Sequence, residues 1–419
     1  MRVLVIGSGA REHALVTALR ADESVTSIIC APGNAGIAAD VDVLPVDASN
    51  PDAVAQLAVD IKADLVVIGP EVPLVAGAAD AVRERGIACF GPSKEAAQLE
   101  GSKAFAKQVM TEANVATAKA YSCSNLDDVA KALDEFGEPY VVKDDGLAAG
   151  KGVIVTSDRH QALEHADNCF AKGAPSVLVE EYLDGPEVSL FGITDGVTIV
   201  PLQPAQDFKR AHDDDEGPNT GGMGAYSPLP WAPAGLVEEV TQSVLQPMVD
   251  AMQRRGTPFV GLLYAGLALT KRGVRIVEFN ARFGDPETQV VLARLKSPIG
   301  QVLLAAATGK VAELAPLEWR EGAAVTVVVA SKNYPDSPVT GDVITGLEEA
   351  NALLDVDVLH AGTRITDEGD VVSAGGRVLS VTAVGDSLAQ ARERAYAGVD
   401  LISLAGSHHR RDIAKSASE

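Results

Sequence analysis

The first hundred residues alternate short, uniformly apolar runs with amphipathic stretches. The apolar runs predict buried strands at residues 3–7, 27–31, 64–69 and 87–91, and helices are predicted at residues 10–19 and 76–86. Buried apolar strands that alternate with helices are typical of a parallel sheet covered on both faces. Each run ends in a turn of Gly, Pro or Asn. We therefore expect an open parallel α/β domain at residues 1–102, with binding groups at the carboxyl ends of its strands.

The pattern changes twice beyond this domain. A helix is predicted at residues 101–115, and a strand-rich segment follows to about residue 190. Strands and helices are then mixed to about residue 325. Strand patterns return at 326–419 with one amphipathic helix at 387–402, which predicts a small β-rich C-terminal domain. The polar tail at 410–419 is expected to be loose.

Charge and cysteine usage narrow the class of protein. The chain has 35 basic and 58 acidic residues, a formal charge of −23, and 47% apolar residues. Such a surface repels nucleic acid and anionic membranes, so a local site must hold any phosphate. No apolar run has the length of a membrane helix or a signal-peptide core. Four dispersed cysteines without a CxxC pair favour a reducing compartment. We expect a cytoplasmic protein with no nucleic-acid or membrane partner.

The glycine-rich turn after the first strand resembles a dinucleotide-binding fingerprint. Gly7 and Gly9 fit that fingerprint, but Glu12 replaces its third glycine, and no acidic residue follows the second strand for a ribose. The helix start can still bind a phosphate through its backbone amides. A nicotinamide-dependent oxidoreductase is therefore disfavoured but stays an alternative.

A second glycine-rich segment, VVKDDGLAAGKGVIV, spans residues 141–155. It is not a P-loop, because its glycine spacing is one residue short, Gly152 replaces the Ser or Thr, and a strand follows instead of a helix. It predicts a hairpin whose amides bind a phosphate, with Lys143 on the first strand and Lys151 at the tip. The alternative is a flexible hairpin with solvated lysines. Asp144 should lie on the opposite face from Lys143, toward solvent or a basic neighbour.

The run 274–280 predicts a strand that ends in a metal site. A two-residue period would place Glu278 and Asn280 on one face with Val274 and Ile276. A carboxylate and an amide oxygen suit Mg²⁺, which also binds substrate phosphates. The alternative is a pair of ordinary polar contacts.

Two further segments carry candidate binding groups. The strand at 177–183 runs into a turn whose backbone suits adenine, with Glu187 placed for ribose hydroxyls; an acidic strand end is the alternative. The charged tetrad 207–210 precedes the glycine-rich segment 217–226, which reads as a substrate loop. The seven histidines form no ligand cluster in the sequence.

Taken in order, these motifs resemble the ATP-grasp family, and within it the ligases that join glycine to 5-phosphoribosylamine. The resemblance covers almost the whole chain, and its motifs are GSGAREHA, APGNAG, GPEVPL, LEGSKAFAK, KDDGLAAGKGV, GPNTGGMGAYSP, GLLYAGL, EFNARFGDPETQ, TGDVI, HAGT and GGRVL. It implies a two-lobed nucleotide domain at 103–325, with a small lid lobe at about 118–190 and a large lobe at about 191–325. It also implies ATP as co-substrate and Mg²⁺ or Mn²⁺ as metal. The implied reaction converts ATP, glycine and 5-phosphoribosylamine to glycinamide ribonucleotide, ADP and phosphate through glycyl phosphate, in de novo purine synthesis.

The resemblance also assigns the site residues. The catalytic candidates are Lys143, Asp207 and Arg282, and the metal ligands are Glu278 and Asn280. The nucleotide would be held by Lys103, Lys143, Gly150, Lys151, Gly152, Glu180, Tyr182, Leu183 and Glu187. The other substrates would be held by Gly9, Asn34, Glu71, Lys209, Gly221, Gly222, Met223, Gly224, Asp285, Pro286 and Glu287. We expect a monomer. A carboxylating or formyl-transferring ATP-grasp enzyme and a catalytically silent nucleotide-binding protein are the remaining rivals.

Overall fold

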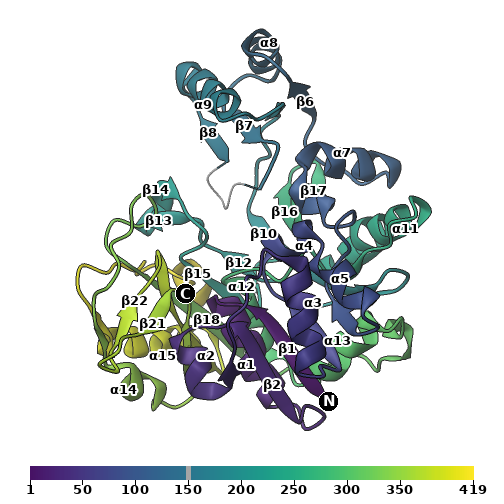
Figure 1. Ribbon diagram of the computed structural model, residues 1–419. Coiled ribbons are helices and arrows are strands. Elements are labelled where there is room, and N and C mark those ends of the chain that lie inside the picture. Colours follow the sequence, from purple (N-terminus) through teal and green to yellow (C-terminus); the bar gives the residue numbers. More distant parts are fainter. Residues whose placement is uncertain (148–151) are drawn as a thin grey trace.

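The computed structural model describes residues 1–147 and 152–419 and consists of a broad body with one lobe projecting from it (Figure 1). The N-terminal elements are β1 (Arg2–Gly7), α1 (Ala10–Arg20), β2 (Ser27–Pro32), α2 (Ala35–Asp40), β3 (Asp42–Val43), α3 (Pro51–Asp60), β4 (Leu65–Ile68), α4 (Glu71–Ala76), α5 (Ala78–Glu84), β5 (Ala88–Phe90) and α6 (Gln98–Gly101). All five strands are parallel, in the order β3-β2-β1-β4-β5. The predicted parallel α/β sheet is confirmed, with β3 as an additional short edge strand.

The uniformly apolar pattern of β1 follows from burial on both faces. Val3 and Val5 point to one hydrophobic cluster with α1 and α13 (Ile299–Ala307), whereas Leu4 and Ile6 point to another with α3 and α5. Successive strand residues face opposite sides, so a strand between two helical layers has no polar face.

The projecting lid lobe is an antiparallel sheet, order β6-β9-β7-β8, covered by two helices and joined to the body through a third. Its elements are α7 (Lys103–Glu112), β6 (Ala120–Cys123), α8 (Leu126–Phe136), β7 (Tyr140–Asp144), β8 (Val153–Thr156), α9 (Arg159–Ala171) and β9 (Val177–Glu180). The lobe has its own core, formed by residues such as Val129, Val142 and Val179. It ends with β9. The expected end at residue 190 is too late, because the next strand already belongs to the body.

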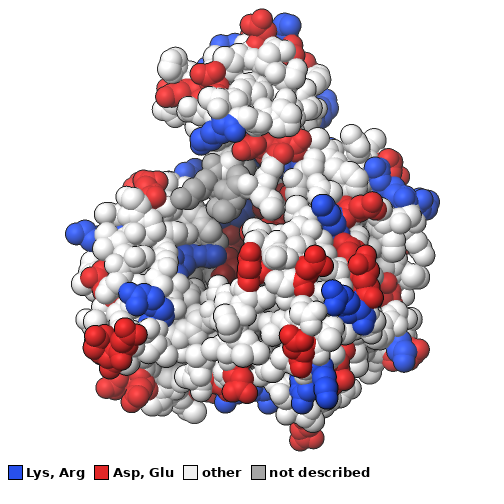
Figure 2. All heavy atoms as spheres, viewed as in Figure 1, with Lys and Arg blue, Asp and Glu red and all other residues white. Residues whose placement is uncertain are grey.

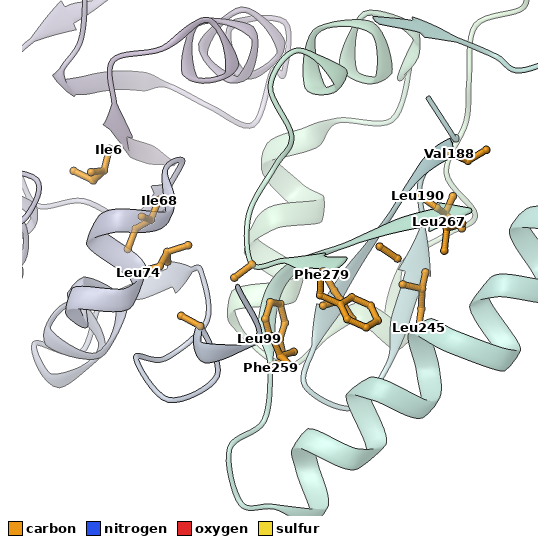
Figure 3. Close-up of a cluster of buried hydrophobic side chains, with 14 of the residues drawn as sticks. Ile6, Ile68, Leu74, Leu99, Val188, Leu190, Leu245, Phe259, Leu267 and Phe279 are labelled. Atoms are coloured by element: carbon orange, nitrogen blue, oxygen red, sulfur yellow. The ribbon is translucent and has the colours of Figure 1, made fainter. Parts of the chain in front are cut away.

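The body centres on a second antiparallel sheet, order β11-β10-β16-β17. The elements of this region are β10 (Glu187–Asp195), β11 (Ile199–Pro201), β12 (Gln206–Asp207), β13 (Arg210–His212), β14 (Glu216–Asn219), β15 (Gly224–Ser227), α10 (Leu236–Val240), a π-helical turn (Thr241–Leu245), α11 (Gln246–Arg254), β16 (Val260–Thr270), β17 (Gly273–Asn280), α12 (Glu287–Arg294) and α13. Figure 3 shows the core here, where Leu190, Leu267 and Phe279 meet Leu245 and Phe259. The same cluster reaches Ile6 and Leu74, so the N-terminal domain packs firmly on the body.

The C-terminal sheet has the order β12-β15-β18-β23-β20, with α15 packed on β18 and β23. Its region contains β18 (Ala323–Ala330), β19 (Ile344–Thr345), α14 (Leu347–Asn351), β20 (Val356–His360), β21 (Thr363–Ile365), β22 (Val371–Ser373), β23 (Arg377–Gly385), α15 (Leu388–Leu401), β24 (Ser403–Leu404) and α16 (Lys415–Ser418). Two of the strands, β12 and β15, come from the segment assigned to the large lobe. A clean boundary at residue 325 is therefore not what the sheet shows, because β15 pairs directly with β18.

The expectation of a loose tail is wrong for its first residues. Arg410 is 1% exposed and Ile413 is fully buried. The Arg410 side chain does not face water, because the carboxylates of Asp412 and Asp215 pair with it. Among the described residues, no helix is long and apolar enough to cross a bilayer.

Candidate active site

The surface is hollowed between the lid lobe and the body, and charged side chains of both signs line the hollow (Figure 2). On the lid side, Lys143 of β7 is 5% exposed. Its Nζ lies 2.7 Å from Oε2 of Glu180, and Nζ of Lys107 lies 2.8 Å from Oε1 of the same carboxylate. Lys143 Nζ also donates to the carbonyl of Val277 in β17 at 3.2 Å. Lys143 thus bridges lid and body. Lys107 was not singled out from the sequence, where it is one lysine on a helix.

The start of α7 faces the same hairpin. Lys103 Nζ donates to the carbonyl of Gly146 at 3.0 Å. Asp145 accepts hydrogen bonds from Ala104 N and from the Ser102 hydroxyl, which ties the helix start to the end of β7. Gly150 and Lys151 lie outside the described residues.

Asp144 lies on the other face of β7 from Lys143, as the alternation predicts. Its amide donates to the carbonyl of Gly152 at 2.7 Å. Burial and then the charge of Asp144 raise the pKa of the Cys169 thiol, which lies on α9. Among the described residues, Asp144 forms no ion pair, so the predicted alternative of a basic neighbour has no support there.

The residues predicted for the nucleotide base lie where β9 leaves the lid. The Glu180 carboxylate is occupied by the two lysines, so it is not free to bind a ligand. Tyr182 is 49% exposed, and Leu183 is half-buried beside it. Glu187, at the start of β10, lies 2.5 Å from Nζ of Lys209.

The predicted metal pair lies at the end of β17. Glu278 pairs with Gly266 and Asn280 with Tyr264, so the two side chains share a face. Ile276 pairs with Leu267 and therefore faces the opposite side. The prediction that Glu278 and Asn280 share a face with Val274 and Ile276 is wrong, because the pairing skips Val277 in a β-bulge. The bulge is what turns Glu278 out of the core.

The Glu278 carboxylate has no hydrogen-bond or ion-pair partner among the described residues. Burial raises its pKa, but the charges of Lys209, Lys143 and Lys103 outweigh burial and hold the pKa below its usual value. In the part of the chain that the structure describes, the amide oxygen of Asn280 accepts a hydrogen bond only from Arg282, at 3.5 Å. An ionised carboxylate on the same strand face as an amide oxygen fits a hard cation such as Mg²⁺.

Arg282 follows β17 and meets two carboxylates from the N-terminal domain. Its NH2 lies 2.9 Å from Glu100, and its Nε lies 3.3 Å from Glu71. Glu100 also accepts the Ala281 amide at 2.8 Å. Burial lowers the pKa of Arg282, but the two carboxylates raise it further than burial lowers it. The structure therefore brings together Arg282 and Glu71, two residues that the sequence assigned to the site. Glu100 was missed because nothing in its local sequence marks it.

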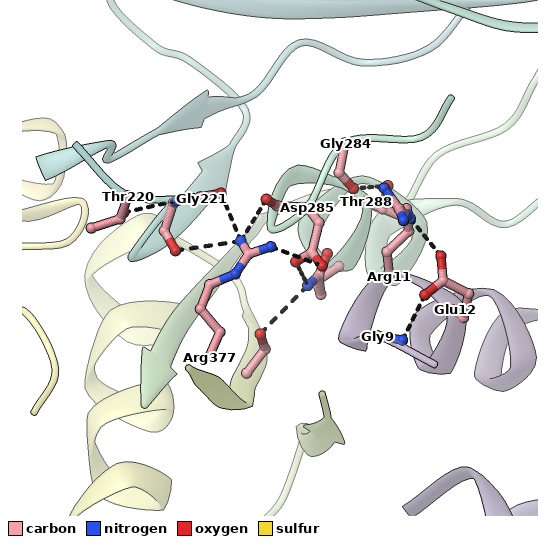
Figure 4. A network of polar contacts seen from close by, with 12 residues as sticks. Gly9, Arg11, Glu12, Thr220, Gly221, Gly284, Asp285, Thr288 and Arg377 are labelled. Atoms are coloured by element: carbon pink, nitrogen blue, oxygen red, sulfur yellow. Dashed lines mark hydrogen bonds and ion pairs between the residues drawn. The ribbon is translucent and has the colours of Figure 1, made fainter. Parts of the chain in front are cut away.

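The loop after Arg282 is held from both sides (Figure 4). Arg377 of β23 donates to the carbonyl of Gly221 at 2.6 Å and to that of Asp285 at 2.8 Å, and its NH2 lies 3.3 Å from the Asp285 carboxylate. From the other side, Arg11 donates to the carbonyl of Phe283 at 3.1 Å. Asp285 and the glycine loop therefore form one unit. Pro286 belongs to it as well, because a Cβ on Gly222 would lie 2.5 Å from the proline ring.

Glu12 explains why the first glycine turn is not a dinucleotide site. Its Oε2 accepts the Gly9 amide at 2.6 Å, and Oε1 lies 2.5 Å from Arg11. The carboxylate is 1% exposed and fills the space next to Gly7 and Gly69. A pyrophosphate cannot take the Gly9 amide without displacing it.

Asn34 at the neighbouring strand end is equally occupied. Its side chain caps α2 through the Ile37 amide and donates to the carbonyls of Ser8 and His360. It therefore fixes the shape of the edge at which a phosphoribosyl group was predicted.

The glycine-rich segment lines the other end of the cleft. Burial, together with Glu287 and Glu187, raises the pKa of Asp207 to about 7, against the opposing charge of Lys209. Met223 is buried, and its amide donates to the carbonyl of Phe208. Gly224 begins β15, where a Cβ would lie 2.7 Å from the carbonyl oxygen of Thr326. Only glycine fits there.

Glu287 anchors a buried polar group under this loop. Its Oε1 accepts from the Tyr264 hydroxyl at 2.6 Å and from the Ser189 hydroxyl at 3.1 Å. Glu287 is 3% exposed, so the predicted contact with substrate is at most through its second oxygen. Tyr264 and Ser189 were not predicted from the sequence.

A lid sheet over a body sheet, with lysines on the lid facing a carboxylate–amide pair on the body, defines an ATP-grasp protein. Comparison with known families specifies it further. The chain matches the N domain of phosphoribosylglycinamide synthetase at residues 1–100, its ATP-grasp (A) domain at 101–288 and its C domain at 324–416. The chain belongs to the phosphoribosylglycinamide synthetase family.

Individual relatives agree over the full length. The chain is 66% identical to a phosphoribosylamine–glycine ligase of Streptomyces coelicolor over 421 residues, which covers 100% of both chains. It is 56% identical to the Mycobacterium leprae ligase, covering 100% of this chain and 99% of the relative. The crystal structure of the Thermotoga maritima ligase superimposes with a TM-score of 0.84 at 32% identity, covering 99% of this chain and 100% of that one. A biotin carboxylase from Campylobacter jejuni shares the fold, with a TM-score of 0.75 at 14% identity over 97% and 92% of the two chains.

Proposed function

We propose that this protein is an ATP-dependent ligase that joins glycine to 5-phosphoribosylamine, giving glycinamide ribonucleotide, ADP and phosphate in de novo purine synthesis. The observation that carries the proposal is the position of Glu278. Its carboxylate, which has no hydrogen-bond or ion-pair partner among the described residues, lies in the field of Lys143 from the nucleotide side and of Lys209 from the charged tetrad 207–210. Glu278 is therefore close to side chains assigned to ATP, the phosphoryl donor, and to side chains assigned to glycine, the acceptor.

The nucleotide is held between the lid and the body. Lys143 and Lys103 supply positive charge to its phosphates, with Lys107 and Glu180 fixing the Lys143 ammonium. The backbone from Glu180 to Leu183 receives the adenine, and Glu187 is placed for the ribose. The family resemblance also assigns Gly152 to phosphate binding, together with Gly150 and Lys151, which lie outside the described residues. Phosphoryl transfer needs such positioning and charge neutralisation rather than a protein nucleophile.

A divalent cation, Mg²⁺ or Mn²⁺, would be held by Glu278 and Asn280. When bound, it neutralises charge on the phosphates. The donor set fits, since the Glu278 and Asn280 side chains share a face and nearby lysines hold the pKa of Glu278 below its usual value.

The glycine carboxylate attacks the terminal phosphate and becomes glycyl phosphate, and ADP leaves. Arg282 is placed to bind the carboxylate or the transferring phosphoryl group. Asp207, Lys209 and the backbone of Gly221–Gly224 shape the glycine end. The amine of phosphoribosylamine then attacks the acyl carbon and releases phosphate.

The phosphoribosyl group is assigned to the strand ends of the N-terminal sheet, near Gly9, Asn34 and Glu71. The Gly9 amide and the Asn34 side chain are already bonded within the protein, so they act by shaping this edge. Asp285, Pro286 and Glu287 close the site from the opposite side. The proposal includes action in the cytoplasm as a monomer; the four buried free cysteines suit a reducing compartment.

A substrate panel tests this function. The purified protein is given ATP and Mg²⁺ with glycine, bicarbonate, formate or no acid, each with and without phosphoribosylamine, and ADP is measured. We expect ADP release to depend on glycine and phosphoribosylamine together. ADP release with bicarbonate or formate would favour the carboxylating or formyl-transferring alternatives. Nucleotide binding without release under any condition would favour the silent one.

A further inference from the structure

The start of the C-terminal tail is clamped onto the segment that follows Asp207. Arg410 is among the largest fully buried side chains of the described residues. Its Nε and NH2 donate to the two carboxylate oxygens of Asp412 at 2.7 and 2.6 Å. Its NH1 donates to Asp215 at 2.7 Å and to the carbonyl of Arg210 at 3.3 Å. One guanidinium thus joins the tail to two points of the segment 210–215.

Backbone amides also join the tail to the segment 210–215. Arg411 N donates to the Asp213 carboxylate at 2.7 Å, and Asp214 N donates to Asp412 at 2.9 Å. Asp214 and Asp215 both have left-handed backbone angles, with φ of 58° and 55°. Consecutive non-glycine residues in this conformation persist only where surrounding contacts hold them. The tail supplies those contacts.

The clamp reaches the glycine end of the cleft through Phe208. The Arg410 guanidinium lies 4.8 Å from the centre of the Phe208 ring. Phe208 N donates to the Gly224 carbonyl, and its own carbonyl accepts Met223 N. The backbone of Phe208 is therefore bonded to the glycine-rich segment at Met223 and Gly224, and its sequence neighbours are Asp207 and Lys209. Ile413 packs against Gly224 from the same side.

We propose that Arg410 is a positioning residue for glycine, acting through Phe208 on Asp207, Lys209 and the loop at Gly221–Gly224. This inference rests on the proposed function, because it concerns the glycine subsite of that reaction. The planar fork of arginine makes the three-way connection, which a lysine ammonium cannot reproduce. The tail that the sequence presents as loose is then part of the substrate site.

The test compares Arg410→Ala and Arg410→Lys with Arg411→Ala in the full-length protein. Arg411 is the matched control, since it is adjacent and exposed and engages its neighbours through its backbone. We expect Arg410→Ala to raise the KM for glycine at least tenfold, with the KM for ATP changed less than threefold. Arg410→Lys should recover only a minor part, and Arg411→Ala should behave as wild type.

Hydrogen exchange of the segment 207–224 gives a readout that does not depend on activity. We expect faster exchange there in Arg410→Ala than in Arg411→Ala. Unchanged exchange would overturn the clamp. Faster exchange or a lower melting temperature with a wild-type glycine KM would overturn the positioning role and leave a purely structural connection. If wild-type protein shows no glycine-dependent ADP release, the proposed function fails, while the exchange result still decides the clamp.

Discussion

Replacing Glu100 by glutamine tests whether Arg282 must be held by a buried charge. The substitution keeps the shape and keeps an oxygen for the Ala281 amide. It removes the charge that lies 2.9 Å from NH2 of Arg282, where the Glu100 side chain is 8% exposed. At an effective dielectric near 20, a pair at that distance attracts by roughly 6 kcal/mol. Burial offsets most of this attraction.

A charged hydrogen bond retains about 1.5–3 kcal/mol net. If Arg282 must be oriented in the transition state, Glu100→Gln should lower kcat by about 10- to 100-fold, since about 1.4 kcal/mol corresponds to a factor of ten. The KM for ATP should change little, because Glu100 contacts Arg282 and Ala281 and is not among the residues assigned to the nucleotide. Steady-state ADP release at saturating glycine measures the effect.

Glu71→Gln is the matched control. This carboxylate lies further from Arg282, at 3.3 Å, and its side chain is 24% exposed. Partly exposed ion pairs contribute only about 0–1 kcal/mol. Loss of the Glu71 charge should mainly raise the KM for phosphoribosylamine and should reduce kcat by less than about fivefold. A wild-type kcat in Glu100→Gln, or a larger kcat loss in Glu71→Gln, would refute the reasoning.

Three other perturbations have defined outcomes. Glu278→Gln should leave the fold intact by circular dichroism and lower turnover by orders of magnitude; near-normal activity at ordinary Mg²⁺ would exclude the carboxylate from the mechanism. Lys143→Ala should raise the ATP KM far more than Asp144→Ala, which should change it less than about threefold, and a tenfold tightening in Asp144→Ala would contradict the strand orientation. Because the folded pKa of Asp207 is raised to about 7, the folded state keeps a proton that the unfolded state releases. Stability should therefore fall as pH rises from about 4 to 7, and Asp207→Asn should flatten this dependence in urea unfolding; an unchanged slope would show that Asp207 does not titrate in that window.

Local sequence patterns predicted the structural features whose physical cause lies within a few neighbouring residues. A strand buried on both faces must be apolar at every position, so Val3–Ile6 revealed the parallel sheet. The sequence likewise predicted the antiparallel pairing of β7 with β8 and the shared face of Glu278 and Asn280, whose role as metal ligands stays a prediction. The bulge at Val277 was missed, because skipping one residue in the pairing leaves the composition of the strand unchanged.

Long-range polar contacts were not predictable. Arg377 lies 156 residues from Gly221, and Glu100 lies 181 residues from Ala281, so only the folded chain brings them together. The burial of Arg410 was not predictable for a similar reason. Its sequence surroundings are polar and resemble a solvated tail. Of the two carboxylates that pair with it, Asp412 lies in the tail itself, but Asp215 lies on another segment.

The transfer of oxygen from glycine to phosphate tests the central claim most directly. Glycine with its carboxylate labelled by the heavy oxygen isotope is supplied with ATP and phosphoribosylamine, and the released phosphate is analysed by mass spectrometry. If the cleft forms glycyl phosphate, each released phosphate should carry one glycine oxygen, in step with ADP and glycinamide ribonucleotide. Unlabelled phosphate accompanying ADP release would contradict the account, because the terminal phosphate would then have passed to water rather than to glycine.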